Sequence, residues 1–386
     1  MTETMVPVDR RKLGGPSWLR LSGHQQAVLV ILPSAIVLAI FVYAFMAWTG
    51  YTSLTDAKLS TGIGEFIGLK NYTDLFTGLR FERFRTDMVN TVYFTVLFIG
   101  LCLGLGLLLA VLLDQKVVGE GFFRTIYLFP MALSFIVTGV VWKWLYHPTR
   151  GLNALPALVG LRPGEFKWFI SGDQWLQFTW QDLGTVYIPL FVLIVDAVMA
   201  FILIRWNRRG GQMPRFAVAG VLLLNTWVLL NGPRDLTNIS RPETHGFNLA
   251  LIALVIAAGW QMSGYTMAMY LAGLRGIPDD LREAARVDGA SEWQIYRHVI
   301  LPLLQPITLS AMIVLGHISL KIFDLVIGMG GFDNPYIDMP GVNMFVTAFR
   351  GNAQGRGAAI AVILLIMVAL IIVPYLRSAL RSEVER

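Results

Sequence analysis

Long apolar segments recur along the chain and are separated by shorter polar ones. A helix needs about 20 consecutive apolar residues to cross the hydrocarbon core of a bilayer, and eight segments approach that length. We therefore predict an all-α, polytopic membrane bundle of about eight transmembrane helices. The apolar runs cover 26–48, 89–113, 123–146, 184–204, 216–232, 248–272, 303–327 and 357–376. The fifth run is short and contains Asn225, so a re-entrant or interfacial segment is its alternative.

A strongly charged stretch, 273–302, separates two of these runs. Each charged side chain would cost about 2.5–3.5 kcal/mol at the centre of a bilayer, so this stretch is an excursion between spans. Pro278 suits a first helical turn, where its missing N–H is harmless. Asp279 and Asp280 follow it and are favourable beside the positive N-terminus of a helix.

The same stretch predicts a second helix after a bend. Gly289 is expected to end the first helix, and Ser291 is expected to cap the next one, which Pro302 ends. The first helix also carries an apolar stripe at helical spacing. A loop that only connects two spans needs no such stripe. An ordered loop that carries one, and has no core of its own to bury it, suits docking to another protein. The stripe consists of Leu281, Ala284, Ala285 and Val287.

This stretch resembles the EAA motif of permease subunits of ATP-binding-cassette (ABC) importers. The family pattern is Glu-Ala-Ala, three residues, Gly, nine residues, then Ile-x-Leu-Pro. The chain matches it with Glu283, Ala284, Ala285, Gly289, Val299 in place of Ile, Leu301 and Pro302. The resemblance implies contact with a cytoplasmic ATPase dimer, with Ala284 and Ala285 on the buried side of that contact. The coupling residues it indicates are Pro278, Asp279, Asp280, Glu283, Ala284, Ala285, Asp288 and Gly289.

Other segments are similar to the sugar permeases of the same family, namely 32–56, 66–76, 123–153 and 321–332. The stretch 154–247 departs from the usual six-span pattern, because it inserts an outer segment and an extra pair of helices. We expect a cytoplasmic tail at 1–25 and a transmembrane permease domain at 26–386, with the coupling loop at 273–302. The resemblance implies a bacterial or archaeal plasma (inner) membrane. Its implied partners are a second permease, most simply in a heterodimer, the ATPase dimer and an extracytoplasmic sugar-binding protein.

Composition agrees with a membrane protein. The chain is 55% hydrophobic and 15% charged, with a mean hydropathy of +0.60. Its net charge of +6 lies in basic residues that flank apolar spans, which favours anionic lipid headgroups over nucleic acid as a partner. The segments expected inside carry the larger share of Lys and Arg, which predicts that both termini are cytoplasmic. The first apolar run is too long for a signal-peptide core, so we expect it to be retained.

The sequence offers no candidates for catalysis. It contains no GxxxxGK[ST] phosphate loop and no HExxH, and its single cysteine, Cys102, lies in an apolar run. We therefore expect no catalytic residues, no metal site and no cofactor. ATP hydrolysis would belong to the partner ATPase.

Polar and aromatic side chains within two spans are candidates for binding the sugar, since polar residues inside a membrane are functional candidates. The candidates are Trp260, Gln261, Ser263, Tyr265, Ser319, Lys321, Phe323 and Asp324. Simpler alternatives exist: Lys321 and Asp324 could pair on one helix face, Ser263 could bond a neighbouring helix, and Trp260 could belong to an interfacial aromatic belt. Asp196 is expected to be a structural partner of a neighbouring helix, and Gly100 and Gly104 form a GxxxG pattern typical of close helix packing.

Two other classes of function remain at this stage. An ion-coupled secondary transporter of a polar solute could use Asp196, Lys321 and Asp324, but it would need no docking helices. A polytopic membrane enzyme would need a polar catalytic cluster near one interface, and the sequence shows none. Copurification with an ATPase would separate all three.

Overall fold

The computed structural model is mostly helical and describes residues 23–62, 64–115, 117–207, 220, 222–223, 225–227, 229 and 234–384. The residues up to Tyr51 form a compact unit of their own. It contains α1 (Gly23–Leu38), a π-helical turn (Ala39–Ala44) and most of α2 (Phe45–Ser53). The second unit, Thr52–Arg386, carries the candidate functional site.

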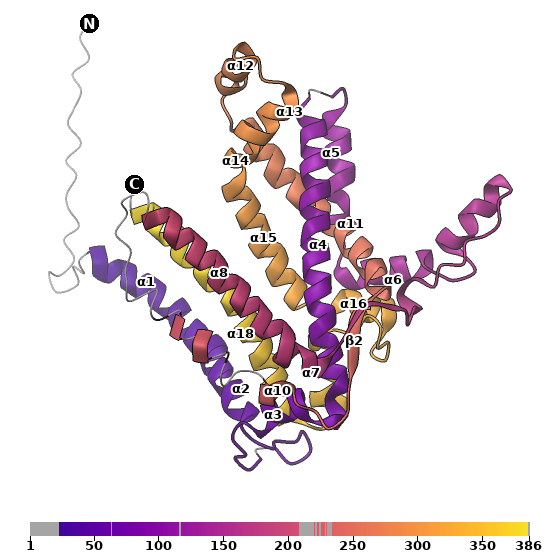
Figure 1. The fold of residues 1–386 in the computed structure, drawn as a ribbon, viewed down its shortest axis with the longest axis vertical. Coiled ribbons are helices and arrows are strands. Elements are labelled where there is room, and N and C mark those ends of the chain that lie inside the picture. The colour runs from indigo at the N-terminus through magenta and orange to yellow at the C-terminus, as the bar shows by residue number, and fades with distance from the viewer. Residues whose placement is uncertain are drawn as a thin grey trace, which may run out of the picture. The chain divides into compact units, whose positions relative to one another are not determined.

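The helices of the second unit are drawn in Figure 1. Before the small sheet they are α3 (Lys70–Thr77), α4 (Glu82–Asp114), α5 (Glu120–Leu128) and α6 (Phe135–Leu145). The two strands are β1 (Gln174–Thr179) and β2 (Thr244–Asn248). Between them in the sequence come α7 (Trp180–Asp182), α8 (Ile188–Asn207) and α10 (Arg234–Thr237). After the sheet come α11 (Ala250–Arg275), α12 (Asp279–Val287), α13 (Glu292–Ile295), α14 (Leu301–Leu303), α15 (Gln305–Leu320), α16 (Asp324–Gly330), α17 (Pro340–Phe345) and α18 (Gln354–Val384).

The core of this unit follows the packing of α4 against α11. Phe94, Phe98 and Cys102 of α4 are buried with Leu254 and Ala258 of α11. Further along α4 the backbones come close, because Gly106 leaves room for Thr266. The Thr266 hydroxyl donates a 2.6 Å hydrogen bond to the carbonyl of Cys102. Small residues and hydroxyl bonds of this kind are how helices associate where lipid, not water, surrounds them. A Cβ placed on Gly100 or Gly104, the predicted GxxxG residues, would meet no atom within 4 Å, so the close approach lies at Gly106 instead.

The membrane-spanning segments match the predicted runs only in part. Among the described residues, four helices are long and apolar enough to span: Val28–Ser53, Leu79–Asp114, Trp180–Ala200 and Ala250–Arg275. Two bent pairs of helices raise this number to six if each pair crosses once. The apolar helix Gln354–Leu370 is shorter than the others, and most of the fifth predicted run, 216–232, lies outside the described residues. The structure therefore supports a multi-span helical bundle without confirming the predicted number of eight.

Two runs that looked continuous in the sequence are broken helices. The run 123–146 divides at Leu133 and Ser134, where the chain turns by 102° between α5 and α6. The helix that contains Pro302 continues to Leu303 and bends by 63° before α15. The prediction that Pro302 ends this helix is wrong. Pro306 explains the break, because it has no N–H to donate to the carbonyl four residues earlier.

The inserted stretch ends in a two-stranded antiparallel sheet. β1 pairs with β2 from Gln174↔Asn248 to Thr179↔Thr244, so the strand that leads into α11 also closes the insert. Just before β2, Glu243 forms an ion pair with Arg85 of α4. The sheet therefore joins the inserted stretch to the N-terminal end of α4.

Candidate coupling site

The charged stretch folds as two helices joined by a glycine bend, as the sequence predicts. Pro278 is the N-cap of α12, one position earlier than expected, and Asp279 and Asp280 lie in its first turn. The backbone of Gly289 has φ of 81°, a left-handed conformation that glycine adopts without strain. Ser291 then forms a capping box with Gln294 at the start of α13.

The end of α12 is a Schellman motif. The N–H of Ala290 donates to the carbonyl of Ala285 at 3.0 Å, and the N–H of Gly289 donates to the carbonyl of Arg286 at 3.0 Å. These bonds satisfy carbonyls that the helix end would leave unpaired. Asp288 is the C-cap residue of α12, so it belongs to the bend. The loop thus has a defined shape without any partner protein.

One side of α12 contacts the core of the second unit. Ala285 packs against the buried cluster that includes Leu113, Leu274 and Ile295. Arg282 reaches α4, where its Nη1 atom lies 2.9 Å from Oδ2 of Asp114. Ala285 is half-buried against this cluster, and its contact with the ATPase stays a prediction.

The opposite side of α12 is open. No residue of this helix is fully buried, and Ala284 is exposed. Val287 is 87% exposed, and Trp293 of α13 is 70% exposed. Residues three and four apart share a helix face, so Asp280, Glu283, Ala284 and Val287 form one continuous surface. We call this set the outward face of α12.

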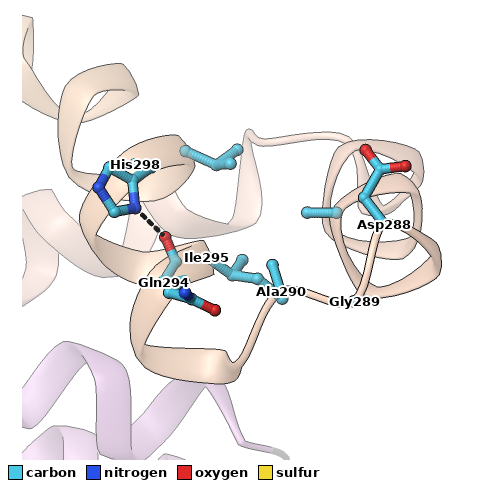
Figure 2. Close-up of a pocket in the computed structure, with 8 residues that line it drawn as sticks. Asp288, Gly289, Ala290, Gln294, Ile295 and His298 are labelled. Atoms are coloured by element: carbon cyan, nitrogen blue, oxygen red, sulfur yellow. Dashed lines mark hydrogen bonds between the residues drawn. The ribbon is translucent and has the colours of Figure 1, made fainter.

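A cleft of about 300 Å³ separates the end of α12 from the following helix (Figure 2). Figure 2 shows Asp288 at the α12 side, with Gln294, Ile295 and His298 across from it. The His298 ring nitrogen Nδ1 lies 3.1 Å from the carbonyl of Gln294, within its own helix. On the same loop, a hydrogen bond to Glu292 raises the pKa of the Arg286 guanidinium, and this exposed ion pair spans the bend. The cleft is lined by Ala285, Asp288, Gly289, Ala290, Gln294, Ile295, His298 and Val299.

The sugar-binding candidates on α11 divide into buried and exposed members. Gln261 is 2% exposed, and its Nε2 atom donates to the carbonyl of Leu133 at 2.7 Å. This bond holds the break between α5 and α6. Ser263 is also buried, whereas Trp260 is exposed and Tyr265 half-buried. Trp260 packs edge-on against Trp142, with ring centroids 5.9 Å apart.

The remaining candidates lie where α15 gives way to α16. Ser319 is buried and accepts a 2.9 Å hydrogen bond from Thr95 of α4. Lys321 and Asp324 are exposed and belong to different helical segments, because α15 ends at Leu320. They form no ion pair among the described residues, so the expectation of a pair on one helix face is wrong. Phe323 lies between them and packs against Phe345 at 5.7 Å.

The ion pairs at both ends of α4 were not predicted from the sequence. At the N-terminal end, the Arg85 guanidinium bonds both carboxylate oxygens of Glu243, with Nε at 2.7 Å from Oε2. At the C-terminal end, Arg282 bonds Asp114. No local pattern links these partners, because Arg85 stands in a polar segment before the apolar run at 89–113 and Arg282 lies in the charged stretch. By contrast, the structural role expected of Asp196 is confirmed, since it accepts a hydrogen bond from Asn225.

Comparison with known proteins identifies the family. Residues 213–385 match the family of binding-protein-dependent transport system inner membrane components. A probable ABC transporter permease protein of Pyrococcus horikoshii is 33% identical over 366 residues, which cover 92% of this chain and 96% of the relative. The chain belongs to the ABC transporter permease family. A xylose/arabinose import permease of Haloferax volcanii is 30% identical to this permease over 345 residues, covering 88% of this chain and 84% of the relative.

Solved structures share the fold. A bacterial ABC transporter involved in the import of the acidic polysaccharide alginate has a TM-score of 0.58 to this permease. The match is 17% identical in sequence and covers 91% of this chain and 95% of the other. The predicted family and helical membrane fold are therefore confirmed, and the permease is a multi-pass membrane protein.

Proposed function

We propose that this permease is one of two membrane subunits of an ABC importer for a sugar, and that α12 docks a cytoplasmic ATPase. The observation that carries the proposal is the outward face of α12. α12 is a fully formed, capped helix. Its inner side is fixed to the permease core, while its outer side presents Val287 and Ala284 to solvent. A helix held so firmly with one face open is suited to transmit force between two proteins.

The geometry of α4 supports the orientation. α4 has 33 residues, which corresponds to about 50 Å at 1.5 Å per residue. Asp114, at its C-terminal end, holds the coupling loop, and Arg85, near its N-terminal end, holds the strand that closes the insert. If α12 faces the cytoplasm, the β1–β2 sheet, which the two ends of the insert form, faces outward. Cytoplasmic termini and a cytoplasmic tail at 1–25 belong to this proposal.

The substrate class is inferred from the relatives. The relatives include permeases for xylose and arabinose and for trehalose and maltose, and one structural neighbour was crystallised with a periplasmic protein bound to an alginate pentasaccharide. We infer that an external binding protein delivers a sugar to this permease. Trp260, Tyr265, Lys321, Phe323 and Asp324 remain accessible for such a ligand. Gln261, Ser263 and Ser319 would shape the site from behind, because they are buried.

The ion-coupled alternative has less support. It needed Asp196, Lys321 and Asp324 as a coupled set, and Asp196 is bonded to Asn225 instead. Membership of the ABC permease family points to ATP as the energy source. Membership of a family of transport system inner membrane components also weighs against the membrane enzyme alternative.

A bulky side chain on the outward face of α12 tests whether the ATPase docks there. Ala284→Trp should release the ATPase during copurification, because a large side chain overpacks a close helix contact by about 1–3 kcal/mol. Val159→Trp is the matched control, since Val159 is also exposed and lies far along the chain from α12. Wild-type ATPase binding by Ala284→Trp would exclude the outward face as the docking surface.

Ala285→Trp separates the two sides of the helix. Because Ala285 packs against the permease's own buried cluster, this change should lower the thermal stability of the permease itself. Ala284→Trp should leave that stability unchanged. Equal stability of the two variants would show that α12 does not lie against the core as described.

A further inference from the structure

Arg282 is the side chain that joins the coupling helix to a membrane span. Its Nη1 atom lies 2.9 Å from Oδ2 of Asp114, the last residue of α4. Its Nη2 atom donates to the carbonyl of Leu274, near the end of α11, at 3.3 Å. One guanidinium therefore contacts both long helices of the core, and its planar fork fits this double role better than a lysine would.

The link is shielded from water. The side chain of Arg282 is 18% exposed and that of Asp114 is 9% exposed. Buried charge pairs are screened by salt much less than exposed ones. A displacement of α12 that pulled the two charges apart would leave both of them uncompensated, so α12 and α4 are coupled strongly.

The neighbouring ion pairs of the loop are different. Arg275 and Glu120 meet at 2.8 Å, with side chains 45% and 28% exposed. Arg286 and Glu292 also meet at 2.8 Å, but both lie within the loop and more than half of each side chain is exposed. Exposed pairs contribute little and are screened by salt. Arg282–Asp114 is thus the most deeply shielded ion pair of the coupling loop.

α4 can carry a displacement across the membrane. Its C-terminal residues Ala110 and Leu113 are buried with Ile295 of α13, and near its other end Arg83 and Arg85 bond Asp338 and Glu243. From Asp114 to Arg85 an α-helix extends about 44 Å at 1.5 Å per residue. A rigid helix anchored at both ends transmits movement of one end to the other.

We propose that Arg282 is a positioning residue for transport, which passes the movement of α12 to α4 through Asp114 without contributing to ATPase docking. This inference rests on the proposed function, because it requires that an ATPase moves α12. The side chain of Arg282 lies on the core side of α12, away from the outward face. Docking and transmission are therefore carried by different sides of one helix.

The test uses the full transporter in proteoliposomes, with the ATPase, the second permease and the cognate sugar-loaded binding protein. Arg282→Ala should retain ATPase copurification and basal ATP hydrolysis. Stimulation of hydrolysis by the loaded binding protein should fall by about 5- to 150-fold, the range of ordinary coupling free energies. Asp114→Asn changes the same link from the α4 side at nearly constant shape, and it should give the same loss.

A second readout follows α4 directly. In a Cys102→Ser background, a cysteine at the exposed position Val92 of α4 should change its labelling rate when ATP binds. Arg282→Ala should abolish that ATP-dependent change in labelling. If Arg282 had a purely structural role, Arg282→Ala would lower the stability of the permease but leave the change in labelling. The double variant Arg282→Asp with Asp114→Arg should recover part of the stimulation, because the charges are restored in reverse.

The exposed pair supplies the control. Arg275→Ala should keep at least half of the stimulation, because its partner Glu120 remains solvated. Normal stimulation in both Arg282→Ala and Asp114→Asn would overturn the proposal. Loss of ATPase copurification in these two variants would also overturn it, since Arg282 would then act in docking. If Ala284→Trp fails to release the ATPase, the proposed docking face is wrong. That result is independent of the stimulation measured in the Arg282 and Asp114 variants.

Discussion

The two ends of α4 are built in opposite ways. At the N-terminal end, Arg85 is fully buried and bonds Glu243 and the carbonyls of Leu75 and Gly78. At the C-terminal end, Asp114 holds α12, a helix without a single buried residue. The buried arginine of the first end has its partners within the chain, whereas the second end carries a helix face that no other described residue buries.

This difference separates stability from function. Buried arginine is tolerated only where the chain supplies a carboxylate and further hydrogen bonds, so the N-terminal end of α4 is fixed by its own sequence. An exposed apolar residue such as Val287 at the C-terminal end gains nothing from the chain around it. Changes at the first end should therefore affect folding, and changes on the outward face of α12 should affect association.

The largest expected effect is at the buried pair. Glu243→Gln leaves the Arg85 guanidinium buried without a negative partner, which costs about 3–5 kcal/mol. Thermal unfolding of the detergent-solubilised permease measures it. Asp333→Asn is the matched control, because Asp333 meets Arg350 at 3.9 Å with both side chains at least half exposed. That change should cost at most about 1 kcal/mol, and equal losses in both variants would remove the contrast between buried and exposed pairs.

The coupling loop could be predicted because its signals are local. Caps and bends depend on residues a few positions apart, as in the capping box of Ser291 and the left-handed Gly289. The Arg85–Glu243 pair joins residues 158 positions apart, and no spacing in the sequence indicates it. Local chemistry thus predicts the caps and the bend of the coupling loop, and only the folded chain shows the ion pairs at the two ends of α4.

The substrate candidates show a second limit. Polarity within an apolar run identifies a side chain that needs a partner, but it does not say whether the partner is a ligand or the bundle. Gln261 bonds the carbonyl of Leu133 and Ser319 accepts from Thr95, so both have partners inside the protein. Asp324 lay in a run that looked like one helix, and the break after Leu320 was not visible from hydropathy.

The next effect lies midway along α4. A side chain on Gly106 would collide with Thr266 of α11, so Gly106→Leu should cost about 1–3 kcal/mol through overpacking. It should also weaken the link between the two ends, because α4 and α11 are pushed apart. Gly100→Leu is the control on the same helix, since Gly100 has open space around it. Equal unfolding temperatures for the two variants would contradict the described packing of α4 on α11.

A smaller effect is expected at the bend of the coupling loop. Gly289 has φ of 81°, where an L-residue costs about 1–2 kcal/mol. Gly289→Val should therefore loosen the end of α12 and reduce ATPase copurification, and it should lower the unfolding temperature of the permease less than Gly106→Leu does. Gly289→Asn should be milder, because asparagine tolerates this conformation. If valine and asparagine behave alike, the left-handed bend does not position α12.

The smallest effect is a pH dependence at the N-terminal end of α4. His245 of β2 is buried, and desolvation lowers the pKa of its imidazole below the usual 6.5, although the neighbouring Glu243 opposes this. The groups around the ring are Glu243, with Oε2 3.4 Å from Nε2, Thr86, Trp180, Phe178 and, by charge, Arg85 and Glu82. Between the lowered pKa and about 6.5, the unfolded chain binds more protons than the folded one, so stability falls as the pH decreases.

The stabilising contribution of neutral His245 is thus complete above about pH 6.5 and is lost as the pH falls through the lowered pKa. Burial raises the pKa of the Asp338 carboxyl above its usual 3.8. At pH values between 3.8 and the raised pKa, this group gives stability the opposite slope. The two groups are separated by variants: His245→Gln should flatten the dependence of the unfolding temperature between pH 7.5 and 5.5, since glutamine does not titrate. His147→Gln should leave that dependence unchanged, because His147 is exposed. An unchanged slope in His245→Gln would show that this imidazole takes no part in the acid sensitivity of the buried end of α4.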